Sequence, residues 1–327
     1  MSFFSVDLMQ SKRKCAVIGC LGTGGTIAWA LAQSGLCDEL VLIDDDKRTA
    51  DGQVADILGA LPYSASPDVW VGDYADLEGC SLIIMAMGIP ALYESAQADQ
   101  IELNLPLVRA AAAGIAANNT EAVVLIAGEP VDIMTHIALH SLGFPPSRVI
   151  GLGTLPLSLR TGKLIAQYLG TDSRNVQAMV LGTDDDNAFL CKTLLRVCGM
   201  SVPSYLKSMG RNDDISLLQS LLDDARYAQG RACDAKGRAD FSVSHACVLI
   251  ADAVLHDRGV LLPLCVCANG YCELSQICMS LPCVLGKHGA RVAYDVIPDF
   301  SETEQLHRSA ARLRAGLLDC ELLFCAK

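Results

Sequence analysis

Residues 16–31 read AVIGCLGTGGTIAWAL, and this stretch decides the fold. A short β-branched run breaks into a glycine cluster, after which Ile27 and Leu31 restart the chain with helical apolar spacing. This order predicts a strand, a tight turn and a helix. Because the first turn of such a helix presents unpaired N–H groups to a pyrophosphate, the stretch is typical of the unit that opens a dinucleotide-binding domain.

A second apolar run ends at a residue that could bind the ribose of a dinucleotide. The run 40–43 ends at Asp44, about 20 residues after Gly24, and an acid there can accept hydrogen bonds from ribose hydroxyls. The glycine pattern itself is damaged, because a G-x-G-x-x-G reading from Gly19 to Gly24 finds Leu21 at the middle glycine. The candidate cofactor-binding residues are Gly19, Gly22, Gly24, Asp44 and Gly88.

Length and charge limit the classes of protein. The chain has 327 residues and a formal net charge of −12. This length suits two domains, which we expect at 1–150 and 151–327. The acidic charge argues against nucleic acid or an anionic membrane as a partner, and no apolar run approaches the roughly 18 residues of a membrane helix. We see no signal peptide and expect an intracellular protein, cytoplasmic rather than mitochondrial.

The chain contains 15 cysteines, a high count. Their spacing lacks a paired C-x-x-C arrangement, and most of them, such as Cys15, Cys247 and Cys278, lie in apolar segments. One interpretation is a zinc or iron–sulfur site. We favour the other, which is free thiols serving as small apolar side chains in a reducing compartment, with no metal site and no disulfide.

Strand and helix signals alternate through the first half of the chain. The expected strands are 16–18, 40–43, 69–71, 82–87, 122–127 and 149–150, and the expected helices include 50–61, 101–118 and 131–142. Six strands that alternate with helices predict an α/β fold with a doubly wound parallel sheet.

Several blocks along the chain resemble one family. They are residues 39–44 (ELVLID), 54–57 (VADI), 129–135 (EPVDIMT), 143–151, 236–237, 241–255 and 277–286 (ICMSLPCVLG). Together they look like the 2-hydroxy-acid dehydrogenases of the lactate and malate dehydrogenase superfamily, over nearly the whole chain. The resemblance implies an N-terminal Rossmann domain followed by a C-terminal α+β domain.

The resemblance also says where catalytic groups belong. In that family a hydride leaves the substrate carbon for the nicotinamide, a histidine takes the hydroxyl proton, an aspartate orients the histidine, and arginines hold the substrate carboxylate. The histidine block reads GTDDD over 182–186, with Asp184 at the histidine, and Leu157 stands at the orienting aspartate. The family also has an arginine three residues after the orienting aspartate. It is retained here as Arg160, the candidate substrate-binding residue.

Two further family positions are changed. Gln97 stands where the mobile loop carries an arginine that polarises the substrate carbonyl, and Glu129 replaces an asparagine that contacts nicotinamide and substrate. No histidine occurs between His140 and His245, so no nearby substitute exists. We therefore assign no catalytic residue from the sequence.

Two functional hypotheses remain. The first is a non-catalytic dehydrogenase-like protein, a pseudoenzyme with a structural or interaction role; the second is a working NAD-dependent malate or lactate dehydrogenase with rebuilt active-site groups. The simultaneous loss of four groups favours the first. Arg160 either binds a carboxylate or pairs with Glu129 or Asp184. The acidic run 184–186 is a metal site, a remodelled base or a solvated loop.

We expect NAD binding to be weak or absent. Leu21 places a side chain where the backbone should approach phosphate, and Glu129 adds negative charge beside the nicotinamide pocket. Gly22 and Gly25 leave open a re-formed turn.

We also expect a homodimer or a subunit of a larger assembly. Val54, Ile57 and Leu58 form an apolar stripe on the helix 50–61, and the resemblance places this helix and the helix 241–255 at a two-fold interface.

Overall fold

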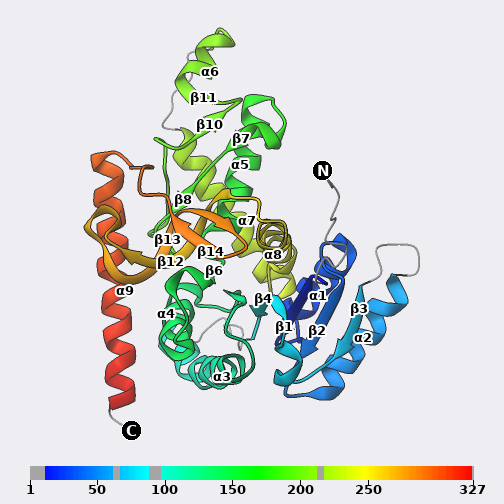
Figure 1. Cartoon of the computed structure of the whole chain (residues 1–327). Helices are drawn as coiled ribbons and strands as arrows, with labels where there is room; N and C mark the ends of the chain where they lie inside the picture. Colours follow the sequence, from blue (N-terminus) through cyan, green and yellow to red (C-terminus); the bar gives the residue numbers. More distant parts are fainter. Residues whose placement is uncertain (1–11, 62–66, 88–96, 212–216, 326–327) are drawn as a thin grey trace, which may run out of the picture.

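The computed structural model describes residues 12–61, 67–87, 97–211 and 217–325. Six parallel strands form its centre: β1 (Lys14–Ile18), β2 (Glu39–Ile43), β3 (Asp68–Val71), β4 (Cys80–Met85), β5 (Val123–Ile126) and β6 (Val149–Gly151). Their spatial order is β3-β2-β1-β4-β5-β6, the arrangement of a doubly wound sheet (Figure 1). The predicted α/β class and the six predicted strands are confirmed.

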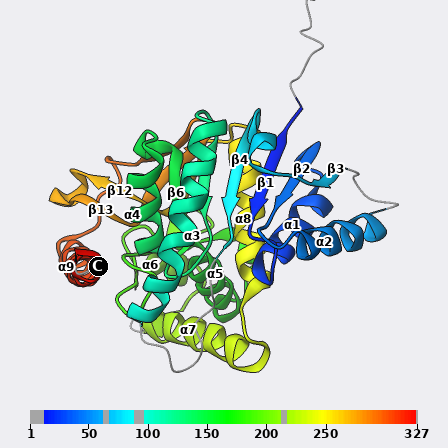
Figure 2. The ribbon, with the colours of Figure 1, turned by 90° about the horizontal axis from the view of Figure 1, so that it is seen from below.

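The strands are apolar because helices cover both faces of the sheet. In β5 every residue is buried, as expected for a central parallel strand. The flanking helices in this half are α1 (Thr23–Ser34), α2 (Lys47–Ala60), α3 (Gln97–Asn118) and α4 (Val131–Leu142). Helices α3 and α4 lie side by side (Figure 2).

The second half extends the same sheet. Three antiparallel strands, β12 (Val260–Asn269), β13 (Ser275–Gly286) and β14 (Gly289–Val292), follow in the order β14-β13-β12, and β12 pairs with β6 through Cys265 and Gly151. One nine-stranded sheet therefore crosses the position between residues 150 and 151. The division into domains at that position stays a prediction.

The remaining elements pack around these strands. The helices are α5 (Leu155–Leu169), α6 (Val202–Ser208), α7 (Leu217–Lys236), α8 (Asp240–Leu255) and α9 (Phe300–Cys325), and the short strands are β7 (Val176–Gln177), β8 (Val180–Leu181), β9 (Phe189–Leu190), β10 (Arg196–Val197) and β11 (Met200–Ser201). Helix α8 packs against α1, while α7 packs against α5. The start of α8 is thereby placed beside the start of α1.

Within the described ranges, no helix is long and apolar enough to cross a membrane. The same ranges contain no group of three or more His, Cys, Asp or Glu side chains arranged to hold a metal ion. The cysteines whose side chains are described are free thiols, and most of them are buried.

Candidate active site

The glycine turn joins β1 to α1 with no room for side chains at two positions. A Cβ on Gly19 would lie 2.7 Å from the backbone of Met87, which follows β4, and φ of Gly19 is +89°. A Cβ on Gly24 would lie 1.7 Å from the carbonyl oxygen of Gly19. These glycines let the turn close tightly between β1, α1 and the end of β4.

Leu21 is exposed and Gly22 is partly exposed, and these two residues of the turn lie just before α1. Gly22 precedes α1 with φ 64° and ψ −114°, no side chain caps the helix, and its first turn holds no acidic residue. The N–H groups that begin α1 are therefore available to an anion. Leu21 is 76% exposed, so its side chain extends into solvent.

Asp44 lies beside this turn at the end of β2. Its Oδ2 accepts a hydrogen bond from the backbone N–H of Cys20 at 2.6 Å, and its Oδ1 accepts one from the N–H of Asp46 at 3.0 Å. The structure thus brings Gly19, Gly22, Gly24 and Asp44 together. Gly88 lies outside the described residues.

Asp132 and Asp184 form a second group of candidate site residues, a pair of carboxyl groups. Asp132, in the first turn of α4, is only 6% exposed, and its Oδ2 accepts a hydrogen bond from the backbone N–H of Asp184 at 2.7 Å. Burial raises the pKa of Asp132 to about 6, although the Asp184 N–H and the Cys265 thiol favour its ionised form. Asp132 therefore titrates near neutrality rather than near 4.

Asp184 belongs to the turn that follows β8. Asp185 shapes this turn, since its Oδ1 accepts hydrogen bonds from the Thr183 hydroxyl at 2.8 Å and from the Asn187 N–H at 2.7 Å. The pKa of Asp184 is raised well above its ordinary value, first by burial and then by the negative charges of Asp132 and Glu129. The Asp184 residue is nevertheless exposed. Water and small solutes can therefore reach it.

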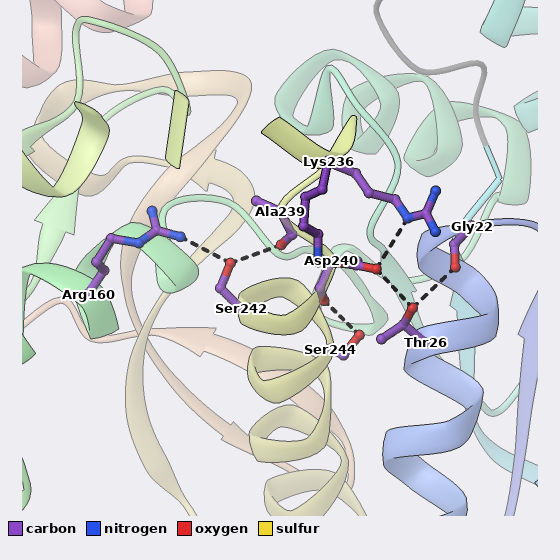
Figure 3. Close-up of polar contacts among 9 residues, drawn as sticks. Gly22, Thr26, Arg160, Lys236, Ala239, Asp240, Ser242 and Ser244 are labelled. Carbon is purple, nitrogen blue, oxygen red and sulfur yellow. Dashed lines mark hydrogen bonds and ion pairs between the residues drawn. The ribbon is translucent and has the colours of Figure 1, made fainter. Parts of the chain in front are cut away.

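Arg160, on α5, carries a positive charge that lowers the pKa of Asp184 in part. Its Nη1 donates to the carbonyl of Ala225 at 3.3 Å and to Oε1 of Gln229 at 2.9 Å. Its Nη2 donates to the Ser242 hydroxyl at 3.1 Å (Figure 3). Among the described residues it forms no ion pair with Asp184 or Glu129. Neutral acceptors on helices α7 and α8 thus fix the guanidinium.

Glu129, at the end of β5, contributes a third carboxyl. Burial raises the pKa of its carboxyl, although the residue as a whole is exposed. Its backbone carbonyl accepts a hydrogen bond from the Asn104 side chain at 3.1 Å. Leu157 is buried in the core between α5 and α7, so it cannot orient a proton acceptor. Asp132 is the residue that the sequence comparison missed; its only signal was its place in the block EPVDIMT, directly after β5.

Two family models match most of the chain. The NAD binding domain of lactate/malate dehydrogenase matches residues 13–151, and the alpha/beta C-terminal domain of lactate/malate dehydrogenase matches residues 158–321. The chain therefore belongs to the lactate/malate dehydrogenase family.

Its relatives include lactate dehydrogenases over nearly their full length. The L-lactate dehydrogenase of Treponema denticola is 30% identical over 314 residues, which are 95% of this chain and 99% of the relative. A solved lactate dehydrogenase from a Medee basin deep-sea metagenome is 28% identical with a TM-score of 0.90, covering 95% of this chain and 100% of that one. The ligand-bound minor L-lactate dehydrogenase of Enterococcus mundtii is 27% identical with a TM-score of 0.87, covering 93% and 97%.

These findings correct two expectations. Weak or absent NAD binding is wrong, because the matched N-terminal model is an NAD binding domain and the relatives are lactate dehydrogenases. The physical reason is that Leu21 extends into solvent while Gly22 re-forms the turn. The non-catalytic, structural role is wrong as the main hypothesis, because the same relatives favour a working dehydrogenase. The non-catalytic hypothesis rested on the missing histidine and did not consider the pair of carboxyl groups of Asp132 and Asp184.

The raised pKa of Asp132 predicts a pH-dependent stability. A carboxyl titrating near 6 when folded and near 4 when unfolded stabilises the protein at low pH, and this contribution is lost as pH rises through 6. The full loss is about 3 kcal/mol, most of it between about pH 4 and pH 6.5. Asp132→Asn should therefore shrink the stability difference between these two pH values, measured by urea unfolding. An equal pH dependence in both proteins would contradict a raised pKa.

Proposed function

We propose that this protein is an NAD-dependent dehydrogenase of a small 2-hydroxy acid, such as lactate or malate, that works with rebuilt catalytic groups. One observation carries the proposal: Asp184 occupies the family's histidine position, and its backbone N–H donates a hydrogen bond to the buried carboxyl of Asp132. An aspartate with an ordinary pKa is a poor proton acceptor at neutral pH, whereas a raised pKa brings the group into the useful range.

The residues at the glycine turn fit a dinucleotide. The open N–H groups that begin α1 suit a pyrophosphate, and the carboxylate of Asp44 suits ribose hydroxyls. When bound, NAD supplies the nicotinamide that exchanges a hydride with the substrate carbon. We keep Gly19, Gly22, Gly24, Asp44 and Gly88 as the proposed cofactor-binding residues.

Asp184 manages the proton in both directions of the reaction. As a carboxylate it accepts the hydroxyl proton when the 2-hydroxy acid is oxidised; as a neutral acid it donates that proton to the carbonyl oxygen when the 2-oxo acid is reduced. Asp132 is a positioning residue, because it holds the backbone of Asp184 and its charge helps to raise the pKa of Asp184. Two adjacent carboxyl groups, one of them buried, resist simultaneous ionisation, which keeps a proton available.

Arg160 is the proposed ligand of the substrate carboxylate. Among the described residues, protein acceptors engage three of its guanidinium N–H groups, and the guanidinium has five such donors. The remaining donors can bind a carboxylate in a fixed orientation. The negative charges of Asp184 and Glu129 lie nearby, so the substrate carboxylate needs this cation.

The carboxyl pair predicts the pH profile of the reaction. Because reduction needs a protonated acid, kcat/KM for oxo-acid reduction should fall as pH rises through the raised pKa of Asp184, and kcat/KM for oxidation should rise over the same interval. Removing the charge of Asp132 lowers the pKa of Asp184, so Asp132→Asn should move the inflection to lower pH.

Steady-state rates with pyruvate and oxaloacetate from pH 4.5 to 9 test this profile. A suitable control is Asp223→Asn on α7, because the Asp223 side chain is 58% exposed and its Oδ1 pairs with Arg226. The control should keep the wild-type inflection. An Asp132→Asn protein with an unmoved inflection would exclude the coupled pair as the proton carrier.

For the assembly and location of the protein we retain the expected homodimer and the cytoplasm as proposals. On α2, Leu58 is 49% exposed whereas Ile57 is buried against the sheet, so only part of the predicted stripe is open to a second chain. The family relationship supports the dimer, and the free thiols support a reducing compartment.

A further inference from the structure

A cation lies directly above the glycine turn. Arg238 belongs to the short connection between α7 and α8, far from α1 in the sequence. A Cβ on Gly22 would lie 3.7 Å from Nη1 and 3.8 Å from Cζ of Arg238, so the guanidinium covers the residue that precedes α1. The open N–H groups of α1 and this guanidinium therefore border the same space.

A buried carboxylate fixes Arg238 in this place. Asp240, the first residue of α8, is 5% exposed, and its Oδ2 accepts hydrogen bonds from Nε of Arg238 at 3.2 Å and from the Thr26 hydroxyl of α1 at 3.1 Å. Figure 3 shows Asp240 facing Thr26 across the two helix starts. Lys236 forms an ion pair with the other carboxylate oxygen. Burial raises the pKa of Asp240, but these three donors outweigh burial and the net pKa lies below its ordinary value.

The local charges indicate which kind of ligand this arrangement can bind. Within this cluster, Lys236 and Arg238 carry two positive charges against the single negative charge of Asp240, so the cluster is positive in a chain with a net charge of −12. Because Nε of Arg238 bonds Asp240, the two Nη groups form the free end of the guanidinium fork. Such a fork binds phosphate oxygens through two parallel hydrogen bonds.

We propose that Arg238 is a cofactor-binding residue whose guanidinium, held by Asp240, contacts the pyrophosphate of NAD at the start of α1. This inference rests on the proposed function, since it assigns a residue to that same cofactor site. It also gives Asp240 and Thr26 a role: they fix the arginine relative to the helix that receives the phosphates.

Binding measurements on Arg238→Gln test the role without any turnover assay. NADH is titrated by its fluorescence, and ADP and adenosine by calorimetry. We expect Arg238→Gln to lower the affinity for NADH and for ADP by roughly 10- to 100-fold. The affinity for adenosine, which has no phosphate, should fall by less than about 2-fold. Arg238→Lys should recover part of the loss, because it keeps the charge without the fork.

Arg174→Gln is the matched control, because Arg174 is an exposed arginine that pairs with Asp172 at the end of α5. It should bind NADH, ADP and adenosine like the wild type. If Arg238 only supported the start of α8, then Arg238→Gln would lower the affinity for adenosine as much as the affinity for ADP, and the inference would fail. The inference alone fails if wild type and Arg238→Gln bind NADH equally. Wild-type protein that binds no NADH would overturn the proposed function as well.

Discussion

Replacing Asp184 with asparagine should lower kcat/KM for oxo-acid reduction by about 1,000-fold or more, while NADH affinity changes by less than about 2-fold. Asparagine has nearly the same shape and keeps the backbone hydrogen bond to Asp132, but it cannot donate or accept a proton at the reacting oxygen. The loss should therefore appear in turnover and not in cofactor binding.

Asp186→Asn is a matched control for this variant. Asp186 lies two residues further along the same acidic turn, is exposed, and has no place in the proposed proton path. We expect it to keep at least about half of the wild-type kcat/KM. If Asp184→Asn retained more than about a tenth of the wild-type rate, another group would have to carry the proton.

The second large effect should come from Gly24→Ala. The added Cβ would lie 1.7 Å from the carbonyl oxygen of Gly19, and that atom belongs to the backbone of the turn and cannot rotate away. The turn must open, which displaces the N–H groups of α1 from the pyrophosphate. We expect NADH affinity to fall by about 100-fold or more, and the free energy of unfolding to drop by about 2–4 kcal/mol.

Gly52→Ala separates this clash from the general effect of replacing a helical glycine. Gly52 lies in α2, and a Cβ there meets no atom within 4 Å. Alanine should stabilise the protein at this site by about 0.5–1 kcal/mol and leave NADH affinity unchanged. Unaltered NADH binding in Gly24→Ala would mean that the glycine turn does not receive the cofactor.

Much of the fold could be predicted because its signals are local. Buried strands such as 82–87 and 122–127 have no polar alternation, so their place inside a parallel sheet follows from their apolar runs alone. The extension of the sheet by β12 could not be predicted in this way, because its pairing with β6 joins Cys265 to Gly151 across more than 100 residues.

The site was harder to predict because its chemistry depends on burial. Asp184 was found at the histidine position, but its raised pKa arises from surrounding protein and from Asp132, which lies 52 positions earlier in the chain. Arg160 could not be assigned acceptors from spacing, since these come from α7 and α8. A sequence comparison therefore registers lost residues more readily than residues that replace them.

Deuterium transfer tests the dehydrogenase proposal most directly. Purified protein is incubated with pyruvate or oxaloacetate and with NADH that carries deuterium at both C4 positions of the nicotinamide, and the product is analysed by mass spectrometry. We predict lactate or malate with one deuterium at C2, and far less label from an Asp184→Asn protein prepared in the same way. A protein that binds NADH but labels neither product would contradict the proposed dehydrogenase.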